Sequence, residues 1–206
     1  MMLKFIECVV IPSNRNSFST AQKCWSEVSS CQGFISQYGG WDQNHGNAII
    51  LSHWQSQAAI NKFMAISHDK IAELNKQHLT YDACTVHYFN LVQTMHGDKK
   101  VSTKEIGFVR VASCKLKVDG SLAFLRDQIN IWTPAMSGCD GMLGGYVAQS
   151  ITDPLHYIVI SLWCDEQSHS LYMTHQFKLA ITQLKLEDYI ENIEGYLLPT
   201  ISSWDL

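Results

Sequence analysis

The sequence predicts an α+β fold made of two tandem ferredoxin-like βαββαβ repeats. Their antiparallel sheets are expected to pack on each other, so that one chain forms a pseudo-dimeric α+β barrel. Three observations predict this fold. The chain repeats itself once at a period of about 108 residues. Each half shows the same order of strand-like and helix-like segments. The central strands are apolar on both faces, which requires cover on both sides of a sheet.

Paired motifs reveal the internal repeat. Ile50 to Trp54 resembles Val159 to Trp163, and a downstream aromatic-Met pair recurs as well. The matching motifs are Cys8 and Cys114, Trp25 and Trp132, Cys31-Gln32-Gly33-Phe34 and Cys139-Asp140-Gly141-Met142, Gly39-Gly40-Trp41 and Gly144-Gly145-Tyr146, and Phe63-Met64 and Tyr172-Met173. We therefore expect a first repeat over 1–95, a polar linker over 96–105 and a second repeat over 106–206.

Each repeat is expected to contain the same six elements. Runs rich in β-branched residues predict strands, and apolar residues at steps of three and four predict the second helix of each half. Ser19 is expected to cap the first helix. In the first repeat the expected elements are strand 4–11, helix 19–30, strands 34–41 and 47–54, helix 57–75 and strand 82–95. In the second they are strand 108–117, helix 121–136, strands 142–151 and 156–163, helix 166–184 and a final strand near 190–197.

Composition narrows the class of protein. The 206 residues are 46% hydrophobic, which supports a packed core and excludes an intrinsically disordered chain. The net charge of −4 and the absence of a Lys/Arg run argue against a nucleic-acid partner. No apolar stretch is long enough to cross a membrane, and Lys4 and Glu7 interrupt the N-terminal apolar run, so no signal peptide is expected. Seven cysteines without a Cys-x-x-Cys pair predict free thiols and a cytoplasmic protein.

The repeat plan and its motifs resemble a known group of proteins. The strand-end Trp54 and the helix carrying Phe63-Met64 and Ser67-His68-Asp69 are similar to those of the dimeric α+β barrel superfamily, which includes the antibiotic biosynthesis monooxygenase-like proteins. More narrowly, the chain resembles a fused two-repeat bacterial family of unknown function, with which it shares the Gly-Gly-Trp strand and the terminal Ser-Trp-Asp-Leu. The resemblance implies the barrel fold, but it does not select an activity within the superfamily.

His68 is the candidate catalytic residue. It shares the apolar face of the predicted helix 57–75, so it is expected to face the cleft between helix and sheet. A neutral imidazole there could accept a proton from an acidic phenol or enol. The alternative is a core histidine whose ring nitrogens are satisfied by the backbone or by Asp69.

Aromatic residues at equivalent positions are the candidate ligand-binding residues. Indole rings offer flat stacking surfaces and an N–H donor. The set is Trp25, Trp54, Phe63, Met64, Trp132, Trp163 and His175. The alternative for the tryptophans is that they brace two equivalent cores, and the alternative for His175 is exposure on a helix surface. The double glycines could mark a bulge or a close backbone approach to a ligand.

These features predict a cofactor-independent, monooxygenase-like protein that oxidises a small hydrophobic or aromatic molecule. No metal-ligand or nucleotide-binding motif is present, so neither a metal nor a cofactor is expected. Haem degradation is disfavoured, because the first strands lack the asparagine that the resemblance would require. Alternatives are a non-catalytic binding or stress-response domain, and a duplication that serves stability only. The chain could be a monomer with an internal pseudo-dimer or a homodimer.

Overall fold

The computed structural model describes residues 1–95 and 102–206. Residues 96–101 of the expected linker 96–105 lie outside the described part. The last residues of this linker form a short 3-10 turn at Thr103–Glu105. The chain divides into two compact units. The first contains Met1–Asn90 together with Thr200–Leu206, and the second contains Leu91–Pro199. Residues 200–206, which the sequence assigned to the second repeat, thus pack with the first unit.

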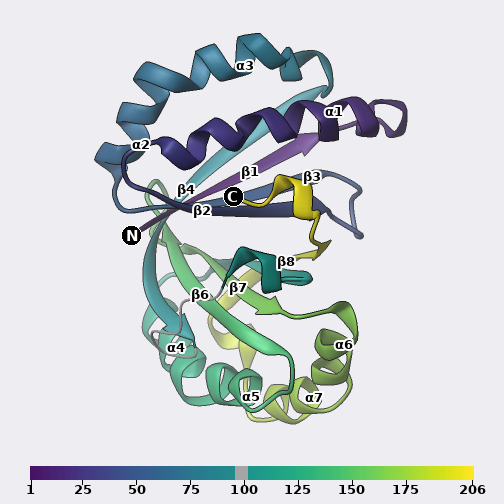
Figure 1. The fold of residues 1–206 in the computed structure, drawn as a ribbon. Helices are drawn as coiled ribbons and strands as arrows, with labels where there is room; N and C mark the ends of the chain where they lie inside the picture. The colour runs from purple at the N-terminus through teal and green to yellow at the C-terminus, as the bar shows by residue number, and fades with distance from the viewer. Residues whose placement is uncertain (96–101) are drawn as a thin grey trace. The chain divides into compact units, whose positions relative to one another are not determined.

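The first unit has a four-stranded antiparallel arrangement in the order β2-β3-β1-β4. In Figure 1 its helices lie along one side of these strands. The strands are β1 (Met2–Val9), β2 (Phe34–Trp41), β3 (Ala48–Trp54) and β4 (Ala83–Met95), of which the last part belongs to the second unit. The helices are α1 (Arg15–Gln22), continued by 3-10 turns at Lys23–Ser30, then α2 (Gln57–Phe63), a π-helical turn at Met64–His68 and α3 (Asp69–Asn75).

The second unit repeats this plan in the strand order β6-β7-β5-β8. Its strands are β5 (Phe108–Leu116), β6 (Met142–Ser150), β7 (His156–Trp163) and β8 (Ile190–Pro199). Its helices are α4 (Ser121–Asp127), a π-helical turn at Gln128–Trp132, α5 (Thr133–Ser137), α6 (Glu166–Thr174) and α7 (Gln176–Ile181). The predicted α+β fold with two βαββαβ repeats is therefore confirmed.

Two helix predictions need correction. The first helix begins at Arg15, so Ser19 lies inside it and is not its N-cap. A 3-10 turn at Pro12–Asn14 leads directly into that helix, so the position before its first residue is Asn14 and not Ser19. The helix expected over 166–184 breaks at His175, where the backbone leaves helical geometry (ψ −77°) and α7 starts.

Equivalent tryptophans close the end of each third strand. Trp54 and Trp163 are fully buried, and each indole N–H donates to a serine two residues earlier on the same strand. The distances are 3.1 Å from Trp54 Nε1 to Ser52 Oγ and 2.9 Å from Trp163 Nε1 to Ser161 Oγ. Each of the two indoles is therefore buried with its N–H satisfied, so both tryptophans pack in the core of their unit.

The double glycines serve close strand packing. A Cβ built on Gly39 would stand 2.4 Å from the carbonyl oxygen of Ile49, and one on Gly145 would stand 2.3 Å from that of Ile160. The register shift of β2 lies between Phe34 and Ser36, away from its glycines, whereas that of β6 lies between Met142 and Gly144, at its double glycine. The close approach is therefore to a neighbouring strand, and a bulge adjoins the double glycine of the second repeat but not that of the first.

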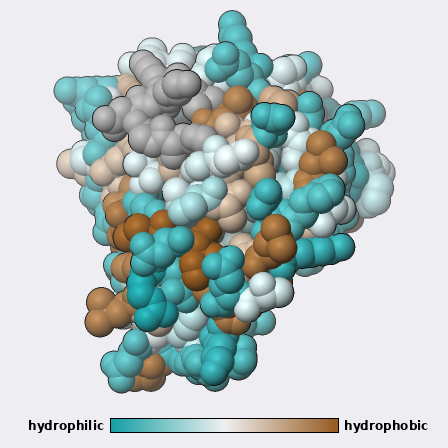
Figure 2. Space-filling model, turned by 90° about the horizontal axis from the view of Figure 1, so that it is seen from below, coloured by the Kyte–Doolittle hydropathy of each residue, from teal (hydrophilic) through white to brown (hydrophobic). Residues whose placement is uncertain are grey.

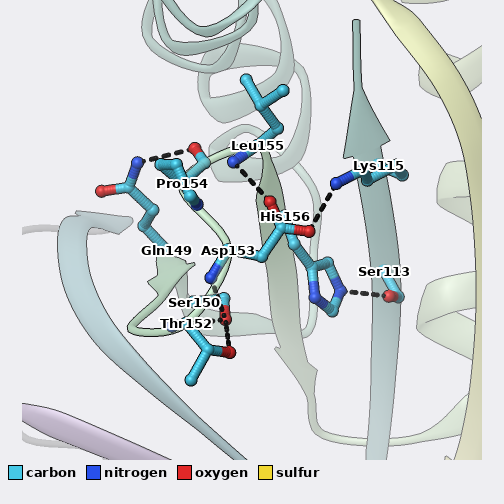
Figure 3. A network of polar contacts seen from close by, with 9 residues as sticks. All are labelled: Ser113, Lys115, Gln149, Ser150, Thr152, Asp153, Pro154, Leu155 and His156. Carbon is cyan, nitrogen blue, oxygen red and sulfur yellow. Dashed lines mark hydrogen bonds and ion pairs between the residues drawn. The ribbon is translucent and has the colours of Figure 1, made fainter.

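A polar network fixes the β6–β7 turn of the second unit against β5 (Figure 3). Asp153 pairs with Lys115 and accepts a hydrogen bond from the Leu155 N–H at 3.0 Å, while His156 Nε2 lies 2.8 Å from Ser113 Oγ. Lys115 and the Leu155 N–H hold the pKa of Asp153 below its usual range. Both charged groups are partly exposed, so the pair defines the turn more than it stabilises the unit.

The helices of the second unit carry several exposed apolar side chains. Figure 2 shows the molecule from below, which is the side on which Figure 1 draws these helices. Hydrophobic side chains lie between hydrophilic ones on this face. The exposed residues are Leu122, Ile129, Leu171 and Leu179.

Within the described residues, no helix is both long enough and apolar enough to span a membrane.

Candidate functional site

A cavity of about 110 Å³ lies inside the first unit. Alternate residues of β1 form its floor, namely Lys4, Ile6 and Cys8, because every second side chain of a strand points to the same face. Side chains of the two strands that pair with β1 extend this floor. These are Ile50, Ser52 and Trp54 of β3 and Cys84 and Val86 of β4.

Aromatic rings close the opposite wall. Trp25 comes from the 3-10 segment after α1, and Phe63 and His68 come from the helical segment after β3. The ring centroids of Trp25 and His68 lie 5.4 Å apart, and those of Phe63 and His68 lie 5.7 Å apart in an edge-on arrangement. These contacts hold the imidazole against the aromatic wall.

His68 lies at the last residue of the π-helical turn Met64–His68. Such turns insert one extra residue into a helix, which rotates the following side chains relative to a regular α-helix. Its side chain is 27% exposed, and its Nδ1 lies 2.8 Å from Oδ1 of Asp69. A carboxylate only accepts hydrogen bonds, so Nδ1 carries the proton, and Nε2 of the neutral ring has the free electron pair that a base needs.

Lys4 is the cation of this cavity. Its residue is only 5% exposed, and Nζ lies 3.7 Å from the Met64 sulfur and 5.6 Å from the centroid of Phe63. Burial lowers the pKa of Lys4 to about 8, although the nearby thiols Cys84 and Cys8 oppose this shift. The ammonium remains protonated at neutral pH and can stabilise an anion formed inside the cavity.

Two glutamines extend the polar edge of the cavity. Trp25 donates its indole N–H to Gln77 Oε1 at 2.6 Å, and Gln77 Nε2 donates to Gln22 Oε1 at 2.9 Å. Gln22 and Gln77 are both buried. The chain of hydrogen bonds orients the Trp25 ring, which also packs against Phe63 and His68.

The second unit contains an equivalent cavity of about 180 Å³. Arg110, Cys114, Gln128 and Trp132 line it at the positions that correspond to Lys4, Cys8, Gln22 and Trp25 in the repeat. At the place of His68 this cavity has Phe177, which stacks on Trp132 at 5.4 Å. Each of the two cavities therefore has one cation and an aromatic wall, but the second cavity has no histidine at the position that corresponds to His68.

His169 is the histidine of the second cavity. It is 5% exposed, and its Nε2 has no hydrogen-bond partner among the described residues. Its ring packs on Phe108 at 5.0 Å and on Trp163 at 5.6 Å. Burial, with a smaller contribution from the charge of Arg110, lowers the pKa of His169 to about 4. It is therefore neutral at pH 7.

The structure brings together four of the predicted site residues and disperses the others. His68, Trp25, Trp54 and Phe63 line one cavity, and Met64 contacts Lys4 beside it. Trp132 lines the second cavity, and Trp163 lies in the core next to His169. His175 lies exposed at the break between α6 and α7, where Nδ1 faces the Leu171 carbonyl oxygen at 3.0 Å.

Sequence reasoning missed several polar residues of the cavities. Among them are Lys4, Gln22, Gln77, His78 and Cys84 in the first unit and Arg110, Gln128 and His169 in the second. The repeat itself held a usable signal, because Lys4 and Arg110 share one offset with Gln22 and Gln128. No comparable signal marks His169 or Cys84, which have no counterpart of the same type. No group of three or more His, Cys, Asp or Glu in the described residues could hold a metal ion.

Comparisons with known proteins agree with this architecture. Residues 2–89 match the model of a domain of unknown function, DUF4937. The uncharacterized protein YdbC of Bacillus subtilis (strain 168) is 36% identical over 80 residues, which are 37% of this chain and 67% of YdbC. The chain belongs to this family of unknown function. The match falls in the first unit, which contains the cavity with His68.

Solved structures extend the likeness over both units. A presumed monooxygenase from Fusobacterium nucleatum superposes with a TM-score of 0.78 at 15% identity, covering 97% of this chain and 91% of that one. A presumed monooxygenase from Lactobacillus acidophilus gives 0.72 at 14% identity, covering 97% and 93%. An anthrone oxidase-like protein gives 0.72 at 10% identity, covering 97% and 91%. The chain thus shares the fold of these proteins over both of its units.

Proposed function

We propose that the first unit binds a one-ring phenol or hydroquinone in its cavity and oxidises it with molecular oxygen. The observation that carries the proposal is the cavity itself, in which a buried cation, Lys4, and a histidine with a carboxylate partner, His68, share one aromatic chamber. Structural relatives described as a presumed monooxygenase and as an anthrone oxidase-like protein support the class of reaction.

The size of the cavity indicates a single ring. An apolar cavity of about 150 Å³ holds benzene, and the volume here is about 110 Å³, which leaves no room for a ligand of two or more rings. Trp25, Trp54 and Phe63 line this cavity, so a flat ligand would pack against aromatic side chains. A hydroxyl group on that ligand would meet either His68 or Lys4, the two polar groups best suited to form and hold a phenolate.

In this proposal His68 is the general base and Lys4 the electrostatic partner. His68 Nε2 takes the proton of the phenol, and the ammonium of Lys4 stabilises the phenolate, which is the electron-rich form that reacts with oxygen. For a hydroquinone the balance is one hydroquinone plus one O₂ giving one hydroxyquinone plus one water. One oxygen atom enters the ring, the other leaves as water, and the substrate supplies all four electrons.

A cytoplasmic location is part of this proposal. All seven cysteines, which lie in the described part of the chain, are free thiols, as is typical of a reducing compartment. We propose a small hydrophobic molecule as the partner and neither a nucleic acid nor a membrane.

The test is oxygen consumption by the full-length chain with hydroquinone below pH 7, where the spontaneous reaction is slow. We expect turnover that falls by about 10²- to 10⁴-fold in His68→Ala, since a general base contributes that much. His175→Ala is the matched control, because His175 is exposed and lies at a helix break outside both cavities. Its rate should equal that of the wild type.

A thermal-shift titration with phenol separates the alternatives. If phenol raises the melting temperature and oxygen consumption stays at the spontaneous rate, the cavity is a binding site without oxidation. If neither signal appears, the proposal is wrong. A parallel titration with haem, followed by its visible absorption, tests the haem-degrading alternative.

A further inference from the structure

Cys8 and Cys84 form a thiol pair across two strands. They occupy directly opposite positions in the antiparallel pairing of β1 and β4. The Cys8 thiol donates to the Cys84 sulfur, and the two Sγ atoms lie 3.2 Å apart. Both side chains line the cavity of the first unit.

The strand pairing already provides the geometry that a disulfide needs. Opposite residues of antiparallel strands have Cα atoms about 4.5 to 5.5 Å apart, and disulfides require about 4.4 to 6.8 Å. A bond of about 2.05 Å would bring each sulfur inward by little more than half an ångström. Rotation about the side-chain torsions can supply this movement, so the sheet need not shift.

The two thiols differ in the way that a reactive pair requires. Cys84 is exposed and Cys8 is buried. The hydrogen bond from Cys8 lowers the pKa of Cys84, and the charge of Lys4 contributes in the same direction. The same hydrogen bond and burial raise the pKa of Cys8. The accessible sulfur is thus favoured as the thiolate nucleophile, and its neighbour remains a protonated thiol.

We propose that Cys84 and Cys8 are a peroxide-reactive dithiol, with Cys84 as the attacking and Cys8 as the resolving residue. The Cys84 thiolate attacks one oxygen of a hydroperoxide and breaks its O–O bond, giving a sulfenic acid and, after protonation of the leaving oxygen, water or an alcohol. The Cys8 thiol then attacks the sulfenic sulfur and releases water. Overall, two thiols and one hydroperoxide give one disulfide, one water and one water or alcohol.

The second unit provides an internal comparison. Cys114 corresponds to Cys8, but the residue opposite it on β8 is Ile193, so it cannot form the same pair. Cys114 is buried, and its sulfur lies 3.8 Å from the Ala112 carbonyl oxygen. Among the other thiols, Cys24 and Cys164 are exposed but lack a neighbouring sulfur in the described structure. Exposure alone therefore does not distinguish Cys84, whereas the paired sulfur does.

The experiment counts thiols in the full-length chain. The reduced protein is treated with hydrogen peroxide, unfolded, alkylated with N-ethylmaleimide and weighed by intact mass spectrometry. The reduced wild type has seven cysteines to label. After a stoichiometric dose we expect two fewer adducts, restored by dithiothreitol, and a Cys8–Cys84 cross-linked peptide in the digest. No substrate is present, so the outcome is independent of the proposed phenol oxidation.

Three variants assign the roles. Cys8→Ser should stop at a sulfenic acid on Cys84, which dimedone traps, and Cys84→Ser should lose no adducts at the same dose. Cys114→Ser should lose the same two adducts as the wild type. Thermal unfolding of each reduced variant confirms that it is folded. The proposal is overturned if the wild type keeps all its adducts until Cys24 or Cys164 is oxidised, or if the disulfide forms between chains.

Discussion

Replacing Lys4 by methionine should stabilise the protein at neutral pH. Lys4 is 5% exposed, and in the described structure its ammonium contacts the Met64 sulfur and the Phe63 ring and forms no ion pair with a carboxylate. Its pKa falls from 10.5 to about 8 on folding because burial disfavours the charged form. At about 1.4 kcal/mol per pKa unit, this costs about 3 kcal/mol of folding free energy below pH 8.

The sign of the pH dependence follows from the same shift. Between pH 8 and 10.5 the unfolded chain binds the Lys4 proton more tightly than the folded chain does. The wild type therefore gains stability as pH rises through this window, and the cost is fully present below it. A methionine has a similar length, is apolar and adapts to irregular packing, so Lys4→Met removes the cost and keeps the contacts.

The assay is urea unfolding of the wild type and Lys4→Met at pH 7 and at pH 10.5. We expect the variant to be more stable by about 3 kcal/mol at pH 7 and by much less at pH 10.5. Lys62→Met is the matched control, because Lys62 is exposed and its ammonium donates to Gln32, so the stability of this variant should be unchanged. A Lys4→Met protein less stable than the wild type at pH 7 would refute the reasoning.

The same variant should lose phenol oxidation, since the buried cation stabilises the phenolate at the cost of folding stability.

Other predictions concern packing and acid stability. Trp204→Ala should lower the unfolding free energy of the first unit by about 3–5 kcal/mol in urea titrations, since Trp204 is 1% exposed and packs on Phe18. Gly39→Ala should cost about 1–3 kcal/mol by the same measurement, because its Cβ would stand 2.4 Å from a backbone oxygen, whereas Gly138→Ala has 3.8 Å of space and should be neutral. His169→Phe should reduce the loss of stability between pH 6.5 and 4 by up to about 3 kcal/mol, since the unfolded state binds that proton more tightly than the folded state. An unchanged pH profile for His169→Phe would contradict the burial argument.

The sequence predicts the fold well because the repeat reports the same pattern twice. Strand and helix periodicities are local properties, and the second copy confirms each assignment in the first, as at Trp54 and Trp163. The aromatic wall of the candidate site was also predictable, since Trp25, Phe63 and His68 lie within such periodic segments. The errors occur at helix boundaries, such as Ser19, where capping depends on the preceding turn.

The polar part of the site depends on contacts between distant segments. Lys4 is a buried cation only because β3, β4 and the turn at Met64–His68 enclose it, and Cys84 meets Cys8 only through the register of β1 with β4. A one-residue change of register would turn one of these thiols to the other face of the sheet. No pattern in the sequence indicates that the helical residue His169 is buried, because its burial comes from packing on Phe108 and Trp163.

The sequence by itself determined the duplication, the order of the elements and the aromatic faces, because each is set by spacing along the chain. The tertiary structure alone decided which polar groups lose their water and which atoms meet. Those two properties make Lys4, Cys84 and His169 chemically distinct from ordinary surface residues, since burial and proximity set the pKa of a group and the identity of its partner.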